Sequence, residues 1–158
     1  MMMQQSARIG RYGLLAYGLW VPSMATPHAV LSAVRSTMDT VSGLVEAQQL
    51  YDEHRGAPEL DRSWSCALDT TDSTEGRVRG VRHLVTTLTV ATAHRIRTPG
   101  PQASALAAIA EEEATRELLE TTTGSGISGV RVNRITRSVT SDRHYYITTY
   151  DLTCIHTD

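Results

Sequence analysis

The stretch VRGVRHLVTTLTVATA (Val78–Ala93) decides the fold of this 158-residue chain. Apolar and β-branched side chains alternate with other residues through it, which is typical of a strand in a sheet with a buried face. Arg62–Thr70 alternates in the same way, and the polar segment Asp69–Gly76 between the two runs is turn-like. Two strands joined by a short polar segment predict an antiparallel hairpin.

Two helices are expected beside this hairpin. Thr26-Pro27 supplies an N-cap and a first-turn proline, so the sequence predicts a helix over Thr26–Ser42. The Ala-rich segment Gln102–Glu120 predicts a second helix with an apolar inner face and an acidic outer face. We expect the inner face to carry Leu106, Ile109, Ala110, Leu118 and Leu119, and the outer face to carry Glu111, Glu112, Glu113, Glu117 and Glu120.

A second hairpin is predicted from the alternating runs Val130–Val139 and Tyr145–His156, and Leu44–Leu50 is a candidate short strand. The predicted fold class is therefore α+β, an antiparallel or mixed sheet of two hairpins with two main helices packed on one face. We expect one domain over residues 24–158, preceded by an extension or arm at residues 1–23.

The extension has the outline of a secretory signal. Arg8 and Arg11 precede the apolar run Tyr12–Val21, and Ser23-Met24-Ala25 places small residues before a possible cleavage point. The run is too short to span a bilayer. Three interpretations stay open: an ordered arm, a start codon placed too early, and a retained signal. An apolar arm outside a domain needs a partner surface, and Trp20 is its expected contact residue.

Composition removes several classes of reaction. All fifteen basic residues are Arg, so sites that depend on a Lys, such as a Walker A loop or a Schiff base, are excluded. Gly124–Gly129 matches G-x-G-x-x-G, but a helix is expected before it and a strand after it. Dinucleotide binding needs the reverse order, so we interpret the segment as a turn.

The histidines and cysteines show no metal-ligand spacing. A site assembled from distant strands, for instance His83 with His144 or His156, stays open, although a packed or surface histidine is the commoner case. Cys66 and Cys154 are expected to be buried free thiols, or a pair if their strands are neighbours. We therefore predict no catalytic residue, no cofactor and no metal.

Charge is segregated along a chain whose net charge is only −2. Residues 24–75 sum to −6, residues 76–97 hold five Arg and no acid, and residues 98–122 sum to −4. Such blocks suit the docking of one subunit on another. The alternative is pairing inside one chain, and nucleic-acid binding is a third reading. The candidate interface residues are Arg77, Arg79, Arg82, Arg95, Arg97, Glu111, Glu112, Glu113 and Trp20.

The order of expected elements over residues 24–158, ending in the Tyr- and Thr-rich strand Tyr145–Thr153, resembles the tail terminator proteins of long-tailed bacteriophages. The resemblance implies a virion protein, assembled in the host cytoplasm, whose homohexameric ring caps the tail tube and joins the tail to the head connector. Its implied partners are further copies of itself, the tail tube protein and the connector or stopper protein. DNA would pass through the lumen without sequence-specific binding, and no membrane is involved.

Two other functions stay open at this stage. A head-completion or stopper protein would occupy the next layer toward the capsid, and only its neighbours in the particle would distinguish it. The signal-like start favours instead an exported small binding or hydrolytic domain. Cleavage after Ala25 would support that third reading.

Overall fold

The computed structural model describes residues 25–41, 43–47, 61–74, 82–97, 100–140 and 142–157. Within them a mixed sheet has the strand order β1-β2-β3-β5-β4. β1 pairs in parallel with β2, and all other neighbours are antiparallel. The predicted α+β class with a mixed sheet is therefore confirmed. The strands are β1 (Val45–Glu46), β2 (Ser63–Thr74), β3 (His83–Arg95), β4 (Ile127–Val139) and β5 (Tyr145–Thr157).

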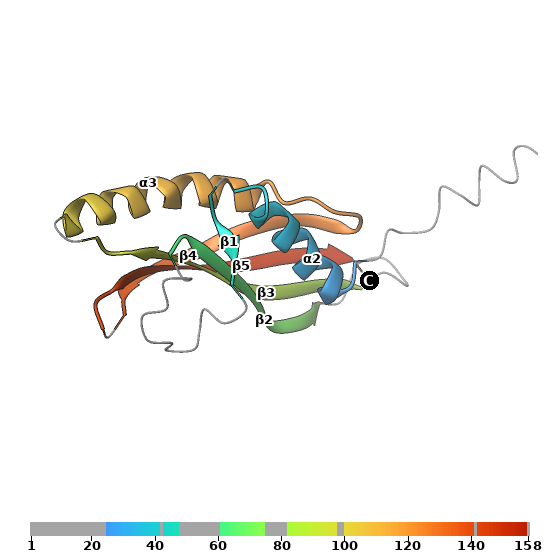
Figure 1. Cartoon of the computed structure of the whole chain (residues 1–158). Coiled ribbons are helices and arrows are strands. Elements are labelled where there is room, and N and C mark those ends of the chain that lie inside the picture. The colour runs from blue at the N-terminus through green and yellow to red at the C-terminus, as the bar shows by residue number, and fades with distance from the viewer. Residues whose placement is uncertain are drawn as a thin grey trace, which may run out of the picture.

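Both helices cover the same face of this sheet (Figure 1). Helix α2 (Pro27–Met38) lies over β2 and β3, and helix α3 (Pro101–Glu120) lies mainly over β4 and β5. The predicted start of α2 is confirmed, because the Thr26 hydroxyl accepts a hydrogen bond from the Ala29 amide at 3.2 Å. The side chain thereby satisfies one of the amides that a helix start leaves without a partner.

The core lies between the sheet and the helices. Leu88 and Val90 of β3 and Leu152 of β5 contribute side chains that are almost completely buried. Cys66 and Cys154 are both free thiols, the second of them fully buried. The remaining core is formed by the buried face of α2, the end of α3 and two aromatic rings: Val30, Val34, Met38, Leu119, Trp64 and Tyr150.

Strand β2 is longer than the sequence predicts. The segment from Asp69 to Thr74 was expected to be turn-like but continues the strand after a bulge between Leu68 and Thr70. Cross-strand hydroxyl pairs hold this polar half in place, Thr70 with Thr87 at 2.8 Å and Thr71 with Thr86 at 3.0 Å. Such pairs stabilise a strand that has little apolar surface to bury.

Several predicted features lie outside the described residues. They are the extension 1–23 with Trp20, and the first part of the basic segment with Arg77 and Arg79. The first described residue, Ala25, is fully buried, and its amide donates to the Thr157 carbonyl at 2.7 Å. Ala25 therefore lies beside the end of β5.

Candidate functional site

Helix α3 does not present the predicted face to the sheet. Its buried residues are Ala108, Glu112, Thr115 and Leu119. Leu106 and Ile109, which were expected to point inward, are 61% and 49% exposed, and Ala110 is also exposed. The prediction was wrong for the first half of the helix. A helix that buries a glutamate while it exposes two large apolar side chains leaves apolar surface that the described fold does not cover.

An ion pair explains why Glu112 can point inward. Arg137 of β4 donates two hydrogen bonds to the Glu112 carboxylate, from Nε at 2.6 Å and from Nη2 at 2.5 Å. The hydrogen bond to Glu112 is the main cause of the raised pKa of Arg137. Because a two-pronged pair fixes both position and orientation, it sets the rotation of α3 against β4. It thereby turns Leu106 and Ile109 away from the core.

A groove of about 240 Å³ lies between α3 and the ends of β4 and β5. Its walls are mainly apolar, and Val139 on its rim is 48% exposed. A second, more open hollow of about 510 Å³ shares Val139 and Tyr146 with it, so the two hollows are neighbours. The groove is lined by Ala105, Ala108, Ile109, Glu112, Arg137, Ser138, Val139, Tyr146, Ile147 and Thr148. We call this first hollow of about 240 Å³, together with exposed Leu106, the apolar groove.

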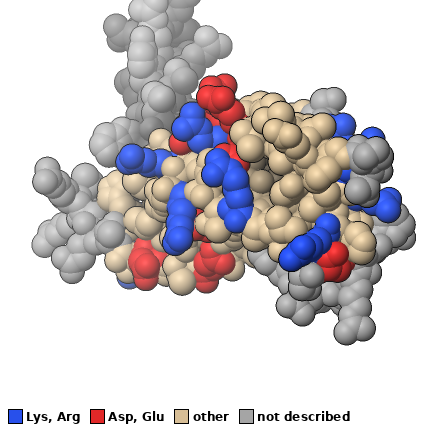
Figure 2. Space-filling model, turned by 90° about the vertical axis from the view of Figure 1, so that its left-hand side faces the viewer, with Lys and Arg blue, Asp and Glu red and all other residues tan. Residues whose placement is uncertain are grey.

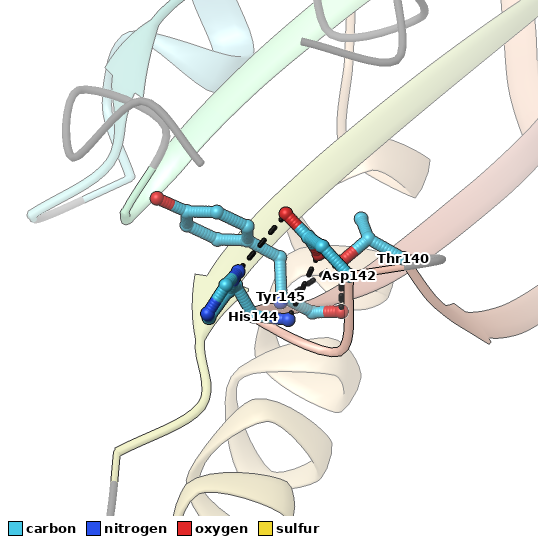
Figure 3. A network of polar contacts seen from close by, with 4 residues as sticks. All are labelled: Thr140, Asp142, His144 and Tyr145. Carbon is cyan, nitrogen blue, oxygen red and sulfur yellow. Dashed lines mark hydrogen bonds and ion pairs between the residues drawn. The ribbon is translucent and has the colours of Figure 1, made fainter. Parts of the chain in front are cut away.

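The turn between β4 and β5 lines the second hollow with Thr140 and Arg143, and a network of polar contacts holds this turn (Figure 3). The Asp142 carboxylate accepts hydrogen bonds from the Thr140 hydroxyl at 2.5 Å and the His144 amide at 3.0 Å. It also lies 3.0 Å from His144 Nδ1. These hydrogen bonds, that of Thr140 first, lower the pKa of Asp142 to about 2. The network holds the turn that carries Arg143, which lines the second hollow.

A polar hollow of about 540 Å³ lies at the start of α3, where β3 ends. His94 Nε2 is 3.4 Å from Glu111, and Arg62 Nη2 is 3.5 Å from the same carboxylate. Burial lowers the pKa of His94, and this effect outweighs the attraction of Glu111. On the opposite wall Asp61 accepts a hydrogen bond from the Arg95 amide at 2.8 Å and lies 3.6 Å from the Arg97 guanidinium.

The predicted charged residues therefore divide into separate sites. Glu111 and Glu112 do pair inside the chain, but with Arg62, His94 and Arg137 instead of the arginines of the basic segment. Arg95 and Arg97 lie beside Asp61, whereas Arg82 and Glu113 are exposed. Among the described residues, no arginine of segment 76–97 pairs with a glutamate of α3. The end of the molecule at which α3 begins faces the viewer in Figure 2. Arginine side chains, with a few acidic ones among them, are spread there over a largely uncharged surface.

Sequence reasoning missed the residues that organise the apolar groove and the polar hollow. Of these residues, only Arg137 could have been found from the sequence. The alternation of β4 places it on the same face as Val139, toward the helices. No pattern marks Arg62, whose backbone has a φ of 57°, or selects His94 from the other histidines.

The comparisons with known proteins add no relative. No protein-family model matches the sequence, and no curated protein is significantly similar to it.

Over the described residues, no three or more His, Cys, Asp or Glu side chains gather in a group that could hold a metal ion. Neither described helix combines the length and apolar character needed to cross a bilayer.

Proposed function

We propose that this protein is a structural virion subunit that assembles into a ring at the head-proximal end of a phage tail tube. In this role it would end tube growth and join the tail to the head connector, as a tail terminator does. The observation that carries the proposal is the apolar groove with its exposed rim of Leu106, Ile109 and Val139. A ring subunit needs such a surface, because each copy must bury apolar area against the next.

The neighbouring sheet edge favours contact through side chains over strand pairing. β4 is an edge strand with irregularities between Ile127 and Gly129 and between Val132 and Arg134. Exposed Arg131 and Arg134 add charge along the same strand. Bulges and charged side chains are devices that prevent open-ended pairing of edge strands. With this edge protected, copies would associate through the groove, and they would form a closed ring where the rotation from one copy to the next closes.

The start of the domain supports an intracellular assembly role over export. His156 is fully buried, and its Nδ1 lies 2.5 Å from the Ala25 carbonyl. Because a carbonyl only accepts, Nδ1 carries the proton, and Nε2 can then accept from the Thr86 hydroxyl at 2.8 Å. Cleavage after Ala25 would remove a buried residue and the acceptor of that proton. A domain designed for such cleavage would not build Ala25 into its core.

Electron microscopy of the purified protein mixed with tail tubes tests the proposal. We expect rings of uniform size that bind one end of each tube, and tubes that stop growing when the rings are present. Ile109→Arg should abolish both effects, whereas Ile155→Arg, on the opposite face of the sheet at 47% exposure, should not. A protein that stays monomeric and leaves the tube ends bare would refute the proposal. Rings that ignore tube ends would indicate a head-completion protein instead.

A further inference from the structure

The position of Ala25, to which residues 1–24 are joined, is fixed. Ala25 is held at the end of β5 by its amide bond to Thr157 and by the His156 contact to its carbonyl. The apolar groove involves the other end of the same strand, at Tyr146–Thr148. Ala25 and the groove are therefore separated by most of the length of β5, which spans Tyr145–Thr157.

We propose that the apolar run Tyr12–Val21 of one copy occupies the apolar groove of a neighbouring copy, as an exchanged arm. This inference rests on the self-association proposed above and identifies the segment that fills the site. The run contains leucines and Trp20 and no charged residue, which matches the largely apolar walls of the groove. The groove volume of about 240 Å³ equals that of roughly eight water molecules, which the arm would displace.

Charge complementarity sets the direction of the arm. The outward stripe of α3 begins with Leu106 and Ile109 and continues, at helical spacing, with exposed Glu113 and Glu117. In the arm, Arg8 and Arg11 lie just before the apolar run. An arm whose apolar part covers Leu106 and Ile109 therefore brings its arginines beside the glutamates when its N-terminal end points toward the C-terminal half of α3.

The reach of the chain keeps the end of the run, Leu19 and Trp20, out of the groove of its own copy. From Thr157 to Thr148, where β5 meets the groove, the strand covers roughly 30 Å at about 3.4 Å per residue. Trp20 lies five residues before Ala25 and extends at most about 18 Å from it. Trp20 and Leu19 therefore cannot enter the groove of their own chain. A second copy that places its groove near Ala25 removes this limit.

Cysteine cross-linking between singly substituted chains tests the exchange. Leu19→Cys protein is mixed with Val139→Cys protein and oxidised, and a disulfide between the two sites forms only between copies. Ile155→Cys is the matched control, because Ile155 is as exposed as Val139 but lies on the other face. Burial raises the pKa of Cys66 to about 12 and of Cys154 to about 11, so these native thiols react slowly.

We expect the Leu19–Val139 disulfide to exceed the control at least tenfold by peptide mass spectrometry. Arg11→Glu should lower its yield, and Glu117→Arg in the partner should restore it. Equal yields with both partners, in a protein that light scattering shows to be oligomeric, would overturn the arm exchange and leave the proposed ring intact. A monomer at all concentrations would overturn both.

Discussion

The two helices cover the same sheet face but use their apolar residues in opposite ways. Helix α2 turns Val30, Val34 and Met38 into the core, and each is fully buried. Helix α3 is longer, yet in its first half it exposes Leu106 and Ile109. The comparison separates two uses of apolar surface, because the residues of α2 stabilise the monomer while those of α3 are available to a partner.

The largest stability effect is expected from the α2 side. Met38→Ala should lower the free energy of unfolding by about 2–5 kcal/mol, because it removes buried methylene groups and leaves a cavity. Met38→Leu, which nearly conserves volume, should cost less than about 1.5 kcal/mol. Urea unfolding measures both. A small loss for the alanine variant would show that α2 is not packed as described.

The α3 side should respond in the opposite way. Ile109→Arg should change the free energy of unfolding by no more than about 0.5 kcal/mol, because the side chain is half exposed. It should weaken self-association at least tenfold, since the exposed half of the side chain would lose roughly 1 kcal/mol of apolar burial and the new charge would be costly to bury. Sedimentation equilibrium measures the association and urea unfolding the stability. Unchanged association would remove the distinction between the helices.

Acid should destabilise the polar hollow through His94. Its pKa in the folded protein is lowered from 6.5, so the unfolded chain takes up the proton first. Stability is therefore complete above pH 6.5 and falls as the pH drops below it, by at most about 1.4 kcal/mol per pH unit for one proton. His94→Gln should flatten this dependence between pH 6.5 and 5. Unfolding curves with the same pH slope for both proteins would contradict the burial of His94.

The smallest effect is expected at the β4–β5 turn. The pKa of Asp142 is lowered from 3.8 to about 2, so its contribution is present above pH 3.8 and is lost as the pH falls to 2. Asp142→Asn should speed hydrogen exchange at the turn at pH 5 with little change in global stability. Asp39→Asn, at the end of α2, is the control. Equal exchange in the variant and the wild type would mean that the carboxylate does not order the turn.

Periodicity in the sequence predicted most of the fold and little of the site. Alternation found the long strands, and the Thr-Pro start found α2, because both signals are local. The rotation of α3 depends on Arg137, which lies seventeen residues beyond the end of the helix and reaches Glu112 only when β4 folds against it. A pattern of apolar residues assumes that apolar side chains face inward, and so predicts the wrong face where an ion pair overrides it.

The extension of β2 to Thr74 was missed for a related reason. Polar residues at Asp69–Thr74 are typical of a turn when the segment is considered alone. Hydroxyl pairs with β3, such as Thr70 with Thr87, make the same segment a strand. Those pairs depend on how β2 is aligned with β3, and the composition of the segment alone does not predict this alignment.

Hydroxyl-radical footprinting across a range of protein concentrations measures directly whether the exposed half of α3 meets another copy. As association proceeds, Leu106, Ile109 and Val139 should lose reactivity together. Leu68 and Ile155, which are 40% and 47% exposed away from the apolar groove, should keep theirs and so serve as internal references. Full reactivity of Leu106 and Ile109 in the associated protein, with protection at the reference residues instead, would contradict the assignment of the groove.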